Sequence, residues 1–253
     1  MVAQFITTLF TYPKAAKFIK ENKLWHGFWQ YRWVLFILMF LAMIVSIKIL
    51  NIMYHGWHEL TKPDSTSTFV HFKAAASTIY QEGYSFLFNG SLKYFIMILL
   101  EVVVFHMVRR TNELLSGVSL TFTFNEFLSA QIRMIKVTIR CFILEMIATL
   151  FLKIFFGIFG FIDYLEPIAI FVAQSYYLGM LMLDSYNESK HMSIKESFLE
   201  GKKYTGMILA LGFVLNLILM VPLLGAMVGP ALAAVTLTMV MFYHLDKRAI
   251  QNA

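Results

Sequence analysis

Long apolar stretches dominate this chain, and polar residues mark where those stretches begin and end. From Tyr204 to Leu245 there are 42 residues without a single Asp, Glu, Lys or Arg. As one straight helix this run would be about 60 Å long, roughly twice the hydrocarbon thickness of a bilayer. Four residues that disfavour a continuous helix lie within it: Pro222, Gly225, Gly229 and Pro230. We therefore predict that the run folds back on itself as a helical hairpin.

Six segments are apolar enough to cross or enter a bilayer. They are Trp33–Tyr54, Tyr94–Val108, Cys141–Ile162, Pro167–Leu183, Tyr204–Val221 and Ala226–Tyr243. Only four residues separate the third segment from the fourth, so Cys141–Leu183 is predicted to form another hairpin. Each hairpin either crosses the membrane fully or enters it partway and returns, and hydropathy alone does not separate the two arrangements.

Two polar pairs have the spacing of a capping box, which starts a helix. Thr123 with Glu126 predicts a helix from about Phe124 into the third apolar segment, and Ser193 with Glu196 predicts one from about Ile194 into the fifth.

The stretch from Pro13 to Arg32 combines four lysines with aromatic and aliphatic residues. This pattern is typical of a basic amphipathic helix at a membrane surface, and we expect it on the cytoplasmic side.

Composition supports a membrane protein: 59% of the residues are hydrophobic and 14% are charged, against about a quarter charged in a soluble domain. The one cysteine, Cys141, excludes an intramolecular disulfide. We predict an all-α integral membrane protein forming a single domain over residues 1–253. It has long transmembrane helices, two helical hairpins, re-entrant or fully crossing, and a basic amphipathic helix at its N-terminus.

The net charge of +6 reflects orientation in the membrane and not nucleic-acid binding. Threading all six segments with the N-terminus inside places sixteen basic residues in cytoplasmic segments: Lys14, Lys17, Lys20, Lys23, Arg32, Arg109, Arg110, Arg133, Lys136, Arg140, Lys190, Lys195, Lys202, Lys203, Lys247 and Arg248. Only Lys62, Lys73 and Lys93 fall outside. We expect a multi-pass protein of the inner membrane with both termini in the cytoplasm.

A set of residues in the C-terminal half has a familiar order. It comprises Pro167, Asp184, Lys195–Glu196, Gly212, Pro222–Leu223–Leu224 and Pro230, followed by small residues up to Thr236. This pattern resembles that of the etoposide-induced protein / CysZ family, best over residues 160–236.

The resemblance implies long spanning helices, two hairpins that penetrate the membrane only partly, and homo-oligomers. In the bacterial CysZ branch it also implies sulfate uptake. The chain departs from that branch at the first hairpin, where Phe151, Leu152 and Lys153 replace a Gly-Leu-Pro turn, and near the first span, where Arg32 stands in place of paired arginines.

Four ionisable residues lie inside the apolar segments: Lys48, Glu101, Glu145 and Lys153. A charge in hydrocarbon costs on the order of 3 kcal/mol, so each needs a partner, water or the interface. We hypothesise a pair between Lys48 and Glu101 with Lys153 nearby; the alternative is that Lys48 extends to the interface while Glu101 hydrogen-bonds across helices. Glu145 is expected to be structural, within reach of the basic face formed by Arg133, Lys136 and Arg140.

The candidate anion-binding residues are Lys153, Arg32 and the broken hairpin with Pro222, Gly225, Gly229 and Pro230. A lone ammonium group and helix ends with free amides both suit an anion. His55 and His58 lack an assured third ligand, so we predict no metal site. No catalytic constellation or cofactor motif can be assembled, so we do not expect an enzyme.

Two functions fit these patterns. The first is an inner-membrane permease for a small oxyanion such as sulfate, with lipid and the anion as partners. The alternative is a membrane scaffold that organises lipid or binds proteins without transporting a solute. The missing Gly-Leu-Pro turn and the scarcity of polar residues in the spans favour that alternative.

Overall fold

The computed structural model describes residues 1–26, 51, 54, 91–118, 124–159, 164–221 and 224–243. These residues are helical apart from short turns, and no strand occurs among them. The helices are α1 (Val2–Glu21), α4 (Ser91–Ser116), α5 (Phe124–Ile158), α6 (Glu166–Glu188), α7 (Ile194–Gly201), the short 3₁₀ helix η3 (Lys202–Tyr204), α8 (Thr205–Leu219) and α9 (Leu224–Met241). The chain is therefore an all-α protein.

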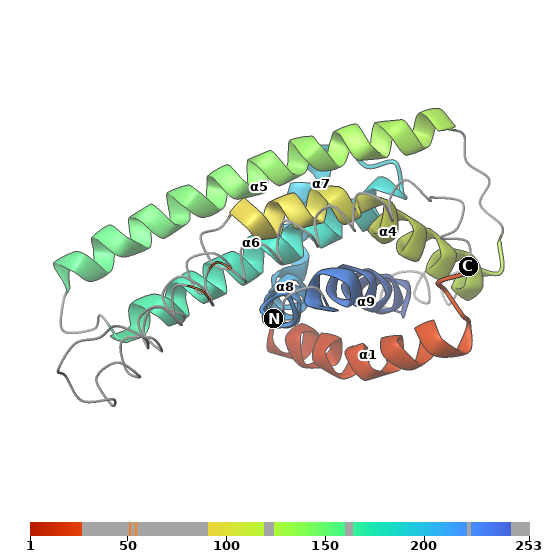
Figure 1. Cartoon of the computed structure of the whole chain (residues 1–253), viewed down its shortest axis with the longest axis horizontal. Helices are drawn as coiled ribbons and strands as arrows, with labels where there is room; N and C mark the ends of the chain where they lie inside the picture. The colour runs from red at the N-terminus through yellow and green to blue at the C-terminus, as the bar shows by residue number, and fades with distance from the viewer. Residues whose placement is uncertain are drawn as a thin grey trace.

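The helices lie in successive layers, which Figure 1 shows with α5 at the top and α1 at the bottom. Helices α4 and α6 pack under α5, α8 packs against α6, and α9 packs against α4. Helix α1 covers α8 and α9 from the other side. The buried core runs through these interfaces and contains mainly aliphatic residues and methionines.

Three helical stretches are long and apolar enough to cross a membrane: Leu128–Ile158, Glu166–Glu188 and Ile194–Leu219. The third is a continuous helical stretch that begins at Ile194 and consists of α7, η3 and α8. Both capping-box predictions hold for the helix starts, because α5 begins at Phe124 and the Ser193 side chain accepts a hydrogen bond from the backbone N–H of Glu196. Thr123 itself lies outside the described residues.

The predicted reversal of the charge-free run is confirmed. Helix α8 ends at Leu219, α9 begins at Leu224, and the two pack against each other. Gly225 makes the close return possible, because a Cβ added there would lie 1.9 Å from the carbonyl oxygen of Ile218. The hairpin is thus held by direct contact between the backbones of its two arms.

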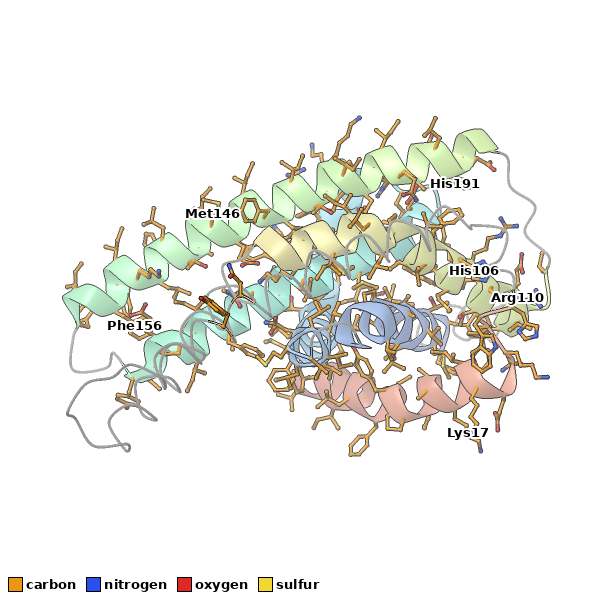
Figure 2. All side chains as sticks on the ribbon, in the orientation of Figure 1. Lys17, His106, Arg110, Met146, Phe156 and His191 are labelled. Carbon is orange, nitrogen blue, oxygen red and sulfur yellow. The ribbon has the colours of Figure 1, made fainter. Side chains whose placement is uncertain are left out.

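Helices α5 and α6 form the other predicted hairpin and extend beyond the remaining helices as an arm (Figure 1). The apolar part of α5 is only 17% buried, whereas that of α6 is 56% buried. Large exposed apolar side chains line α5 along most of its length, including Ile139, Ile147, Phe151 and Ile158. Phe156, labelled in Figure 2, is buried on the side that faces α6. In a membrane protein such a surface suits contact with lipid.

Helices α6 and α8 cross at two glycines. A Cβ at Gly212 would lie 1.6 Å from the carbonyl oxygen of Ser175, and a Cβ at Gly179 would lie 1.9 Å from that of Ile208. The two backbones touch at these points, which is how small residues let helices approach closely in membranes. This crossing fixes α6, and with it the polar residues that α6 carries, relative to the α8–α9 hairpin.

The N-terminal helix differs from its prediction. It begins at Val2 instead of Pro13 and ends at Glu21, so Pro13 lies inside it. Its buried face consists of Thr8, Thr11, Tyr12 and Ala15. The Tyr12 hydroxyl donates to the backbone carbonyl of Leu211 at 2.9 Å, which ties α1 to α8. The lysines Lys14, Lys17 and Lys20 are exposed, so the helix is amphipathic, but one face packs on protein.

Candidate functional site

A bidentate ion pair joins α5 to α6. Arg133 of α5 donates from Nη2 to Oδ1 of Asp184 at 2.8 Å and from Nε to Oδ2 at 3.0 Å. Its Nη1 donates to the backbone carbonyl of Met192, just beyond the end of α6. The Asp184 side chain is 2% exposed and that of Arg133 is 15% exposed. Such a bidentate pair is strong and sets the geometry of both groups.

Glu101 of α4 lies next to this pair and is fully buried, at 1% exposure. Its Oε2 accepts a long hydrogen bond of 3.5 Å from the Ser185 hydroxyl, while its Oε1 has no hydrogen-bond partner among the described residues. Asp184 and Glu188 of α6 and Arg133 of α5 all lie close enough to act on its charge. Three carboxyl groups therefore surround one guanidinium group.

A pocket of about 690 Å³ opens beside this cluster, where α4, α5 and the end of α6 meet. We call it the junction pocket. Its lining includes Phe105, Val108, Arg109, Glu126, Ser129, Ile132, Arg133, Lys136, Ser185, Glu188, Ser189, His191, Met192 and Ile194. In Figure 2, His191 lies near the end of α6, beside the first half of α5. The pocket combines apolar walls with charged groups of both signs, as binding sites for small molecules commonly do.

The cations of the junction pocket are not equivalent. Arg133 is bound to Asp184, and Nε of Arg109 lies 3.3 Å from Glu113. Lys136 has no ion-pair partner among the described residues and its side chain is exposed. It is thus the pocket's cation best placed to receive an anion from outside the protein.

A second polar cluster lies farther along α5 and corrects the expectation for Glu145. Nζ of Lys93 lies 2.9 Å from Oε1 of Glu145, and Tyr94 donates its hydroxyl to the other carboxylate oxygen. Both charged side chains are 5% exposed. Glu145 was expected to face Arg133, Lys136 and Arg140, but it points to the start of α4.

This pair also corrects the sequence-based threading. There, Lys93 lay at the outer end of one span and Glu145 near the inner end of the next, yet the structure places them in direct contact. The segment Tyr94–Val108 therefore lies beside the first half of α5 and not beside its apolar second half. The two predicted spans are therefore offset along the helix axes.

The expected proximity of Lys153 to the Glu101 pair is excluded by the same offset. Lys153 is eight residues beyond Glu145 on α5, and Glu101 is eight residues beyond Lys93 in the opposite direction. At 1.5 Å per residue they lie about 24 Å apart along the helices. Lys153 is exposed on the α5–α6 arm and does not line the junction pocket.

The other predicted site residues have mixed outcomes. Gly225 and Gly229 are buried where α9 packs on Leu215, Ile218 and Leu219 of α8, so their role here is close packing. Pro230 is buried inside α9 and cannot donate to the carbonyl four residues earlier. Three further candidates, Arg32, Lys48 and Pro222, lie outside the described residues, as do His55 and His58, for which no metal site was predicted.

Sequence reasoning missed the junction pocket, although it singled out several of its residues. Arg133 and Lys136 were singled out only as part of a basic face within reach of Glu145, and Asp184 appeared only as part of a family pattern. Asp184 and Glu188 are four residues apart near the end of an apolar helix, which places them on one face. An acidic face on one apolar helix and a basic face on the next could have suggested their pairing.

Comparisons with known proteins found no match: no family model, no curated protein and no solved structure matches this chain. Within the part of the chain that the structure describes, no three His, Cys, Asp or Glu residues lie close enough together to hold a metal ion.

Proposed function

We propose that this protein is a membrane permease for a small oxyanion and that the junction pocket is its anion-binding site. The observation that carries the proposal is the position of Lys136, an ammonium group without an ion-pair partner among the described residues, at a pocket next to three membrane-compatible helices. An anion there would gain a charge-assisted hydrogen bond that no neighbouring carboxylate already uses.

The surroundings of Lys136 support an oxyanion more than a hydrophobic solute. Ser129 brings a hydroxyl group to the same pocket, and His191 adds a ring nitrogen. Hydroxyl and N–H donors replace the hydration of an oxyanion when it leaves water. The resemblance of residues 160–236 to the CysZ family supports sulfate as the first anion to test and an inner-membrane location.

Sulfate uptake into proteoliposomes tests the proposal directly. We expect labelled sulfate to enter vesicles that contain the protein and Lys136→Ala to reduce that uptake at least several-fold. Lys14→Ala is the matched control, because Lys14 is exposed on α1 and does not line the pocket. Lys153→Ala should also leave uptake unchanged. A loss of uptake in that variant alone would indicate that the anion-binding site lies on the α5–α6 arm and not in the junction pocket. Absence of uptake for sulfate, phosphate and chloride would refute the permease.

One observation favours the second candidate, a lipid-organising scaffold. The exposed apolar side chains of α5 extend over 31 residues, from Leu128 to Ile158, or about 46 Å, whereas the hydrocarbon core is about 30 Å thick. A helix with so long an exposed apolar surface must tilt or thicken the bilayer around it. A scaffold would change bilayer thickness or curvature in electron micrographs of vesicles while transporting none of the three anions.

A further inference from the structure

The buried carboxyl group of Glu101 has no place in anion binding as described so far. It lies on α4, one helix away from Lys136, and it does not line the junction pocket itself, whereas its neighbours Arg133, Ser185 and Glu188 do. Whether the Glu101 carboxyl group is ionised depends on the charges that face it from the helices packed on α4.

Those charges are two acidic groups against one basic group. From α6, Asp184 and Glu188 face Glu101; from α5, only Arg133 does. Helix α9 also packs against α4, and its sequence contains no titratable residue. Arg133 already directs two of its donor nitrogens at Asp184 and the third at the carbonyl of Met192. None of these three nitrogens is therefore directed at Glu101.

An ionised Glu101 would be poorly compensated in this position. One oxygen has no hydrogen-bond partner among the described residues, and the other accepts only a 3.5 Å hydrogen bond. Removing a carboxylate from water costs several kcal/mol unless cations or donors replace the lost hydration, and a buried carboxyl group avoids this cost by keeping its proton. A second negative charge beside Asp184 would add repulsion.

We propose that Glu101 is a proton-binding site linked to the junction pocket, so that protonation of Glu101 and binding of an anion in the pocket favour each other. The proton on a Glu101 oxygen is released to the carboxylate of Glu188 or to water in the pocket, which leaves the Glu101 carboxylate, and it returns by the reverse route. An anion at Lys136 brings negative charge close to this cluster and favours the protonated form. Binding linkage then requires that protonation favours the anion to the same extent. This part of the inference depends on the proposed anion site.

Infrared spectroscopy of the reconstituted protein tests the proton site without any transported solute. At neutral pH we expect the carbonyl-stretch band of a protonated carboxylic acid, its downshift in deuterated water, and its loss in Glu101→Gln. Glu113→Gln is the control, because Glu113 is ion-paired with Arg109 and Arg110 and should be ionised. Should Glu101→Gln fail to fold, Ser185→Ala assigns the band instead: this change removes the hydroxyl bound to Glu101 and should shift the band frequency. A band that neither variant alters would overturn the proposal, as would the absence of any such band.

Calorimetry of sulfate binding in buffers with different ionisation heats tests the link to the pocket. We expect proton uptake on binding when the pH is high enough that the infrared band of Glu101 is partly lost in the sulfate-free protein, and no such uptake in Glu101→Gln. Sulfate binding without proton uptake would refute the linkage and leave the permease intact. If Glu101 is protonated but the protein binds no sulfate, the proton site stands and the anion site is refuted. The two proposals can therefore fail separately.

Discussion

Lys93 and Glu145 form an ion pair 2.9 Å long that joins the start of α4 to the middle of α5, with both side chains 5% exposed. Glu145→Gln would leave a buried ammonium group without its carboxylate, and losing one partner of a buried pair costs about 3–5 kcal/mol. We expect a clear fall in the thermal unfolding midpoint in detergent. Lys17→Ala is the control, since its pair with Glu21 is largely exposed and contributes little.

The double variant Lys93→Met with Glu145→Leu separates the loss of charge pairing from the loss of packing. Replacing both charges by apolar groups of similar size avoids a lone buried charge, so the double variant should be more stable than Glu145→Gln alone. If it is equally unstable, the contribution of Glu145 comes from its hydrogen bond with Tyr94 or from packing, and not from the ion pair.

The crossing of α6 and α8 should tolerate no side chain at Gly212. In Gly212→Ala the new methyl group would collide with the Ser175 carbonyl, so the helices must separate, at a cost of about 1–3 kcal/mol or more. A lower yield of folded protein by size-exclusion chromatography and a lower unfolding midpoint are expected. Gly157→Ala is the matched control on α5, because nothing lies within 4 Å of its added methyl group; wild-type behaviour of Gly212→Ala would show that the helices do not touch here.

The Arg133 guanidinium should not be replaceable by an ammonium group. Lysine has no planar fork and cannot bind both oxygens of Asp184 while also reaching the carbonyl of Met192, so Arg133→Lys should lower stability by about 2 kcal/mol. The comparison is with Arg140→Lys, whose guanidinium stacks over the exposed side of Phe198 at 4.6 Å. Thermal unfolding in detergent measures both, and equal midpoints would contradict the bidentate pair.

Burial raises the pKa of Tyr12 above its ordinary value. Because the folded protein holds this proton more tightly than the unfolded chain does, the contribution of Tyr12 is complete below about pH 10 and is lost as the pH rises above it. Stability should therefore fall more steeply in alkali for the wild type than for Tyr12→Phe. At neutral pH the same substitution should cost about 1 kcal/mol by removing the hydrogen bond to Leu211. If stability falls equally steeply above about pH 10 in the wild type and in Tyr12→Phe, the burial of Tyr12 is contradicted.

Local sequence signals predicted where most helices start and where the chain reverses. The capping box at Ser193 and Glu196 is satisfied by contacts within one turn, so it does not depend on the rest of the fold. The reversal near Gly225 follows from helix length alone, since 42 charge-free residues exceed any bilayer. The N-terminal helix was predicted too late because proline is common in the first turn of a helix, and here Pro13 lies in its middle.

The partners of the buried charges could not be predicted, because they depend on how far neighbouring helices slide past one another. A shift of four residues moves a side chain by about 6 Å, enough to replace one ion-pair partner by another. The partner expected for Glu145 was taken from the basic face of its own helix, whereas its contact with Lys93 depends on how far α4 is offset against α5, which hydropathy does not give. The Arg133–Asp184 pair was missed for the same reason, although both faces were visible in the sequence.

The contact between α1 and the α8–α9 hairpin has a consequence for biogenesis. Tyr12 binds a carbonyl group 199 positions later in the chain, so the ribosome must complete nearly the whole protein before the first helix finds its surface. Until then its buried threonines and aromatic rings need temporary protection, by lipid headgroups or a chaperone. Truncation just before α9 should therefore leave the amino terminus open to proteases even though every residue of α1 is still present.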